Sequence, residues 1–125
     1  MKASPGSGAA EVPDELGAQL AQWGKVAIVE TRGRASGRVV RTAVGFVEDG
    51  ADLLVAAGLD SADWALNLRA NPLCTVSIEE RTADYTAHEV RPDERARAVV
   101  ALILKYGTPA ERLGHGPVFR LTLRW

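Results

Sequence analysis

The sequence predicts a mainly β (α+β) domain. Six antiparallel strands are expected to form a barrel or a strongly curled sheet, with about three short helices at its edges. Strand-like segments follow one another directly and are joined by hairpin signals, the strongest of which is Asp49-Gly50. Strands and helices do not alternate along the chain, which disfavours a doubly wound parallel sheet.

Length and composition are those of one globular domain. The chain has 125 residues, of which 46% are hydrophobic and 25% charged, as in ordinary soluble domains. We expect a flexible leader at residues 1–12 and a single domain at residues 13–125. The single cysteine, Cys74, excludes an internal disulfide. The longest apolar run, Val99–Leu104, is too short to span a membrane, and no secretory signal is visible, so we expect a cytoplasmic protein.

The first half of the domain is predicted to contain one helix and three strands. Pro13 and Asp14 begin a short helix that Gly24 ends. Apolar alternation and bounding glycines then predict strands at Lys25–Arg32, Val39–Glu48 and Asp52–Ala57.

The second half is predicted to contain two helices and three strands. The first helix runs from Asp60 or Ser61 to about Arg69 and ends before Pro72, because the residue that precedes a proline avoids the α region. A second hairpin around Glu80-Arg81 joins strands at Cys74–Glu79 and Thr82–Val90, and a last strand runs from Val118 to about Arg124. The second helix begins at Pro92 and stops at Gly107, and its predicted apolar stripe is Ala96, Val99, Val100, Ile103 and Leu104.

A basic, glycine-bounded loop is the first candidate site. Between Lys25 and Arg41 the chain carries five basic residues and one acidic residue, although its overall net charge is −1. Backbone N–H groups in such a loop can form an anion-binding nest, and its arginines and serine hydroxyl can add hydrogen bonds to phosphate or carboxylate. A solvated hairpin loop is the alternative for this segment. The loop residues are Arg34, Ala35, Ser36, Gly37 and Arg38, and Arg41 follows.

A small-residue strand end is the second candidate. Ala56, Ala57 and Gly58 leave room for a flat ring against the backbone, and Trp64 and Asn67 follow on the next helix. Trp64 and Leu68 are spaced for one helix face, and such pairs are more often core packing than ligand contacts.

Several other kinds of site are disfavoured. The chain lacks the two commonest nucleotide-binding loops, and its two histidines and single cysteine offer no metal site. Nucleic acid is not expected as a partner, because the net charge is near zero and no aromatic residue interrupts the basic segment.

Both candidate segments resemble the deazaflavin-dependent nitroreductase family of actinobacteria. The most specific matches are the loop Thr31-Arg32-Gly33-Arg34-Ala35-Ser36-Gly37 and the helix end Trp64-Ala65-Leu66-Asn67-Leu68-Arg69-Ala70-Asn71-Pro72. Between them, Arg41-Thr42, Asp49-Gly50 and Val55-Ala56-Ala57 follow in the family's order, and the similarity extends from about Val26 to Leu123.

The resemblance implies a six-stranded antiparallel split β-barrel of the flavin-reductase kind and binding of the 8-hydroxy-5-deazaflavin coenzyme F420. It implies that the phosphate and acidic tail of the cofactor contact Arg34, Ala35, Ser36, Gly37, Arg38 and Arg41. It implies that the ring contacts Ala56, Ala57, Gly58, Trp64 and Asn67. The reduced cofactor would pass a hydride to a small-molecule acceptor such as a quinone, a nitroaromatic or an activated alkene, and no catalytic acid is assigned.

The sequence departs from the family pattern at two places. Ala35 stands where many members have a second basic residue. The segment after Ala57 is shorter than usual and places Asp60 and Asp63 near the expected anionic cofactor.

Two alternatives to F420-dependent reduction stay open: an FMN-binding reductase of the same fold, and a non-catalytic carrier of a lipid or other apolar ligand. A homodimer is compatible with this fold, but no residue requires one.

Overall fold

The computed structural model describes residues 24–58, 61–107 and 116–124. The expected leader and the helix predicted from Pro13 to Gly24 lie almost wholly outside these residues. The described elements, in chain order, are β1 (Ala27–Arg32), β2 (Val39–Val44), β3 (Phe46–Asp49), β4 (Asp52–Ala56), α2 (Asp63–Ala70), β5 (Leu73–Ile78), β6 (Arg81–Glu89), α3 (Pro92–Tyr106) and β7 (Val118–Leu123).

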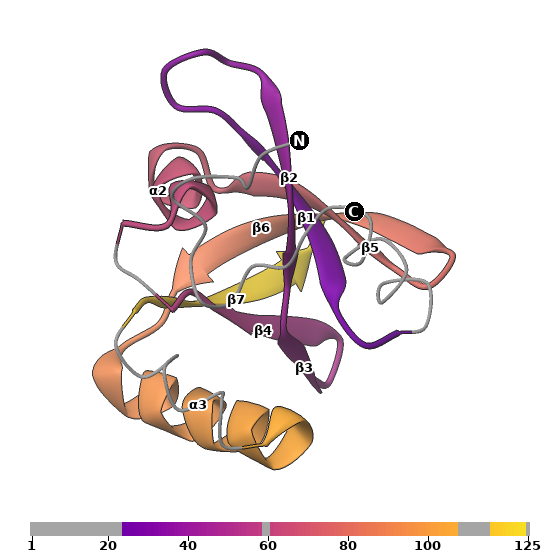
Figure 1. Ribbon diagram of the computed structural model, residues 1–125, viewed down its shortest axis with the longest axis vertical. Helices are drawn as coiled ribbons and strands as arrows, with labels where there is room; N and C mark the ends of the chain where they lie inside the picture. The colour runs from indigo at the N-terminus through magenta and orange to yellow at the C-terminus, as the bar shows by residue number, and fades with distance from the viewer. Residues whose placement is uncertain (1–23, 59–60, 108–115, 125) are drawn as a thin grey trace, which may run out of the picture.

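All seven strands form one antiparallel sheet with the order β2-β1-β5-β6-β7-β4-β3. The two outermost strands, β2 and β3, are consecutive in the chain and are separated by Gly45 alone. Because one residue joins the two edge strands, the sheet must curl until its two edges come together. The result is the curled half-barrel seen in Figure 1.

The prediction of six strands was wrong by one, because the strand expected at Val39–Glu48 changes partner at Gly45. β2 pairs with β1, whereas β3 pairs with β4. A Cβ atom at Gly45 would lie 3.2 Å from Cε2 of Tyr106, so glycine leaves room for the tyrosine ring at the junction. The Tyr106 hydroxyl donates to the main-chain oxygen of Lys25 at 2.6 Å and accepts from the Phe46 N–H at 3.1 Å.

The two larger apolar clusters lie on opposite faces of the curled sheet. The inner cluster is closed by Trp64 and Leu68 of α2, and the Trp64 ring lies 6.1 Å from that of Phe119. On the outer face, Ala98 and Leu102 of α3 pack against Leu54, Ala56 and Val118. Figure 1 shows α3 along the side of the sheet formed by β3 and β4, away from α2.

The face that α3 buries matches the predicted stripe only in part, because Val99 and Ile103 pack against the outer cluster whereas Ala96, Val100 and Leu104 are exposed. Ala98 and Leu102 are the buried residues of this helix, whereas Val100 and Leu104 are 56% and 82% exposed. Tyr106 continues the series of Ala98 and Leu102 at four-residue spacing. Its hydroxyl bonds at the Gly45 junction therefore lie on the same face of α3 as the buried residues.

Most local signals are confirmed, with small shifts. Gly50 has φ +65° in the β3–β4 turn, and Gly107 ends α3 with φ +94°. The β5–β6 turn lies one residue earlier than predicted, at Glu79-Glu80, and Glu79 itself adopts a positive φ of 56°. The N-cap of α2 is Ala62, which provides no side-chain hydrogen bond, rather than Asp60 or Ser61. None of the helices in the described ranges is long and apolar enough to cross a membrane.

Candidate functional site

The loop between β1 and β2 is held in a tight turn by its own hydrogen bonds. The Gly33 N–H donates to the Arg38 oxygen at 2.7 Å, and the Gly37 N–H donates to the Gly33 oxygen at 2.8 Å. The Ser36 hydroxyl oxygen accepts from the Arg38 N–H at 3.1 Å. A Cβ atom at Gly33 would lie 2.7 Å from that hydroxyl, and Gly37 has φ +75°. The two glycines therefore permit this turn for different reasons, close approach and backbone conformation.

Asn67 of α2 joins the loop to the helix. Its side-chain oxygen accepts from the main-chain N–H of Arg34 at 3.2 Å and from Arg34 Nη1 at 2.8 Å. Its Nδ2 donates to the Thr31 hydroxyl at 3.1 Å. Asn67 and Thr31 are each only 2% exposed, and they are the buried polar residues of the described chain. This buried polar contact is satisfied on both sides and fixes the start of the loop against α2.

Asp63, in the first turn of α2, forms an ion pair with the same Arg34 guanidinium that donates to Asn67. Arg34 Nη2 lies 3.2 Å from Asp63 Oδ1, and the Asp63 side chain is 76% exposed. The acidic residue that departs from the family pattern thus contacts a predicted anion-binding arginine. Part of the Arg34 charge is neutralised by this pair.

Other donors of the loop have no such partner. In the ranges that the structure describes, the Arg38 side chain and the main-chain N–H groups of Ala35 and Ser36 make no hydrogen bond. All three residues are exposed. Main-chain N–H groups of a turn and a guanidinium are the kinds of donor that bind small anionic groups such as phosphate or carboxylate.

Arg41 lies apart from this donor set. It is on β2, where its Nε donates to the Glu30 carboxylate of β1 at 2.9 Å, and the two residues are register partners. Its side chain is 71% exposed. The structure therefore places Arg41 on the strand pair that carries the loop, already paired with a carboxylate.

The residues predicted to line a ring are buried. Ala57 and Trp64 belong to the inner core, whereas Ala56 belongs to the cluster under α3. Gly58 is also buried. The Trp64 indole N–H has no hydrogen-bond partner among the described residues. The structure thus unites the loop with Asn67 but leaves these four residues packed in the interior.

Sequence reasoning did not identify Thr31 as part of this site. The period-two alternation of β1 gives a signal, because Thr31 falls on the same inward face as Ala27 and Val29. A hydroxyl among inward-facing apolar residues needs a partner, and Asn67 provides it.

The comparisons with known proteins agree with this architecture. A family model described as F420H(2)-dependent quinone reductase matches residues 9–112. A solved structure described as an F420-H2 dependent reductase is 24% identical, with a TM-score of 0.66 over 78% of this chain and 93% of the other.

Two further structures show how widely the fold is used. A conserved hypothetical protein from Mycobacterium tuberculosis is 15% identical, with a TM-score of 0.70 over 100% of this chain and 87% of the other. HutZ, the heme storage protein from Vibrio cholerae, is 20% identical, with a TM-score of 0.67 over 90% of each chain. At such identities these structures establish the shared fold alone.

Proposed function

Because the chain belongs to the F420H(2)-dependent quinone reductase family, we propose that it is an oxidoreductase that uses reduced F420 to reduce a small electron-poor acceptor. A quinone is the first candidate acceptor, and nitroaromatics and activated alkenes follow from the same hydride chemistry. The predicted family resemblance and the split-barrel, flavin-reductase-like fold are confirmed.

The observation that carries the proposal is the attachment of the arginine loop to α2. The hydrogen bonds from Arg34 to Asn67 hold the loop backbone in one position, so that the free main-chain N–H groups at its tip need no reordering when an anion binds. Preorganised donors bind more tightly because less conformational entropy is lost on binding.

In this proposal Arg38 and the main-chain N–H groups of Ala35 and Ser36 bind the phosphate or the acidic tail of the cofactor. Arg34 contributes the charge that Asp63 leaves unneutralised, and Gly37 keeps the turn tight. Arg41 adds from β2 only the charge that Glu30 leaves unneutralised. Bound F420H2 would supply a hydride, and this chemistry belongs to the cofactor. The protein's own part is to bind the anionic end, orient it and exclude water.

A parallel titration with F420 and FMN tests the proposal, with ligand fluorescence as the signal, at low and moderate salt. We expect F420 to bind more tightly than FMN, and its affinity to fall with added salt because ion pairs are screened. Arg38→Gln should weaken F420 binding about tenfold and reduce the salt dependence, since a charge-assisted hydrogen bond is lost. Arg97→Gln removes the same charge from the exposed face of α3 and should change neither.

Preferential binding of FMN would contradict the cofactor assignment. Binding of neither ligand would contradict the reductase proposal and favour a carrier of an apolar ligand. If F420 binds, oxidation of F420H2 by a soluble naphthoquinone and by a nitroaromatic, measured by absorbance, decides between the acceptors.

A further inference from the structure

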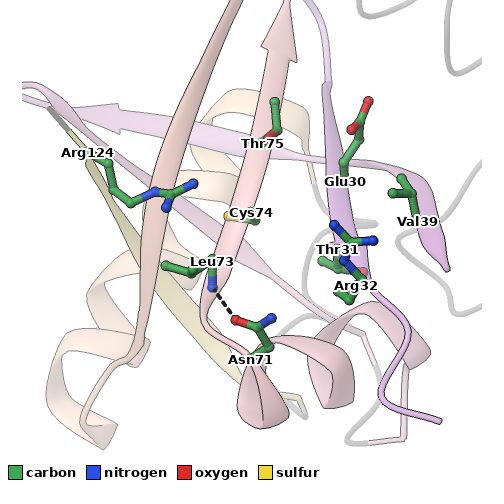
Figure 2. A pocket seen from close by; sticks show the side chains of 9 residues that line it. All are labelled: Glu30, Thr31, Arg32, Val39, Asn71, Leu73, Cys74, Thr75 and Arg124. Carbon is green, nitrogen blue, oxygen red and sulfur yellow. Dashed lines mark hydrogen bonds between the residues drawn. The ribbon is translucent and has the colours of Figure 1, made fainter. Parts of the chain in front are cut away.

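A hollow opens where β1 and β5 separate. The two strands pair at Ile28–Ser77, Val29–Val76 and Glu30–Thr75, and their ladder ends there. Beyond it, the last residues of β1 and the first residues of β5 are not paired with each other. The hollow has a volume of about 220 Å³ and is lined by Glu30, Thr31, Arg32, Val39, Asn71, Leu73, Cys74, Thr75 and Arg124. Figure 2 shows the Arg32 and Arg124 side chains on opposite sides of Cys74.

The charged groups of this hollow differ in how far they are neutralised. The Glu30 carboxylate accepts from Arg41 Nε at 2.9 Å, and Arg124 lies 3.7 Å from the Asp84 carboxylate. Arg32 donates through Nη1 to the Gly37 main-chain oxygen at 3.0 Å. In the described part of the chain no carboxylate pairs with Arg32, so its guanidinium keeps its charge and further donors for a ligand.

The mouth of the hollow is apolar. Val39 on β2 and Leu73 on β5 flank Arg32 and are 51% and 44% exposed, although both are large hydrophobic residues. Cys74 forms part of the floor, is 4% exposed and is uncharged at neutral pH, because burial raises the pKa of its thiol to about 11. A guanidinium that has no carboxylate partner and lies between two exposed apolar side chains is complementary to a molecule with one anionic and one apolar end.

We propose that this hollow binds a small organic carboxylate, with its carboxylate group on Arg32 and its apolar part between Val39 and Leu73. Arg124 adds positive charge from the opposite side. The volume is below the ~300–1,000 Å³ of pockets for drug-sized ligands, which limits the ligand to a small acid. The site is separate from the free donors of the arginine loop and does not depend on the proposed cofactor.

Benzoate is a suitable probe, and benzamide is its uncharged counterpart of the same shape. Isothermal titration calorimetry measures binding to the 125-residue protein without cofactor. Cys74 is the only cysteine, and more of its thiolate forms at about pH 9. The rate of its alkylation by iodoacetamide at that pH, measured by mass spectrometry, reports whether the probe is bound, and the variants below test where it binds. We expect benzoate to slow alkylation saturably, and benzamide to have little effect at the same concentrations.

Three variants test the residues. Arg32→Gln should raise the benzoate concentration for half protection about tenfold or more, because a hydrogen bond to a charged group is lost. Leu73→Glu places a carboxylate at the mouth of the hollow and should prevent benzoate from protecting Cys74 against alkylation. In Arg97→Gln, which makes the same charge change on α3, benzoate should protect Cys74 as well as it does in the unaltered protein.

Equal protection by benzoate and benzamide, unchanged benzoate protection in both Arg32→Gln and Leu73→Glu, or absence of benzoate binding at millimolar concentrations would each overturn the proposal. Thermal unfolding of each variant, compared with the unaltered protein, separates loss of the site from loss of the fold.

Discussion

The side-chain oxygen of Asn67 accepts two hydrogen bonds from Arg34, one from the main-chain N–H at 3.2 Å and one from the guanidinium at 2.8 Å. A single buried amide on α2 thus holds both the backbone and the side chain of the first arginine in the loop. Its Nδ2 continues the contact to Thr31 on β1. Helix, strand and loop therefore meet at one residue.

Asn67→Leu should destabilise the protein by about 1–3 kcal/mol, since it leaves the Thr31 hydroxyl and the Arg34 N–H without their partner. It should also weaken F420 binding, because the loop is no longer held against α2. Asn67→Asp keeps an acceptor for Arg34 and should bind F420 better than Asn67→Leu. Urea unfolding and the F420 titration measure the two effects. Equal F420 affinity in Asn67→Leu and the unaltered protein would exclude a role of Asn67 in positioning the loop.

Asp63→Asn should strengthen F420 binding a few-fold, because it removes the carboxylate that neutralises part of the Arg34 charge. Stability should change by less than about 0.5 kcal/mol, as expected for a pair this exposed. The matched control is Asp93→Asn, which removes an equally exposed carboxylate from α3. Weaker F420 binding in Asp63→Asn would mean that the ion pair orders Arg34 for the cofactor instead of competing with it.

Tyr106→Phe should cost about 1–2 kcal/mol in unfolding free energy, because the hydroxyl bonds to Lys25 and Phe46 at the β2–β3 junction are lost. Tyr85→Phe is the control, since the Tyr85 hydroxyl has no hydrogen bond to any described residue. Chemical denaturation compares the two variants. An equal loss in both would show that the junction bonds contribute nothing specific.

Stability should fall at alkaline pH through Cys74. Burial raises the pKa of its thiol from 9.0 to about 11, so between these values the unfolded chain loses the proton that the folded chain retains. Unfolding free energy therefore decreases as pH rises through this window. Cys74→Ala is expected to be less stable at neutral pH but to show a shallower decline. Parallel declines in both proteins, measured by urea unfolding from neutral to alkaline pH, would assign the effect to other groups.

Much of the fold could be predicted because its signals are local. Asp49-Gly50 marks a turn through the positive φ that glycine accepts, and Gly107 ends α3 for the same reason. Period-two alternation marks β1 and β5 by their buried residues. The division of the Val39–Glu48 segment at Gly45 was not predictable in this way, since either half reads as strand and the change of partner depends on β1 and β4.

The sequence by itself determined the turn of the arginine loop, because its glycines and its internal hydrogen bonds join residues that are neighbours in the chain. Only the tertiary structure decided which of its charges are free. Arg34 contacts Asp63 and Asn67, which lie 29 and 33 positions later in the chain. Arg32 and Arg124 line one hollow although they lie near opposite ends of the described chain. Such distant residues come together because the order of the strands in the sheet differs from their order in the sequence.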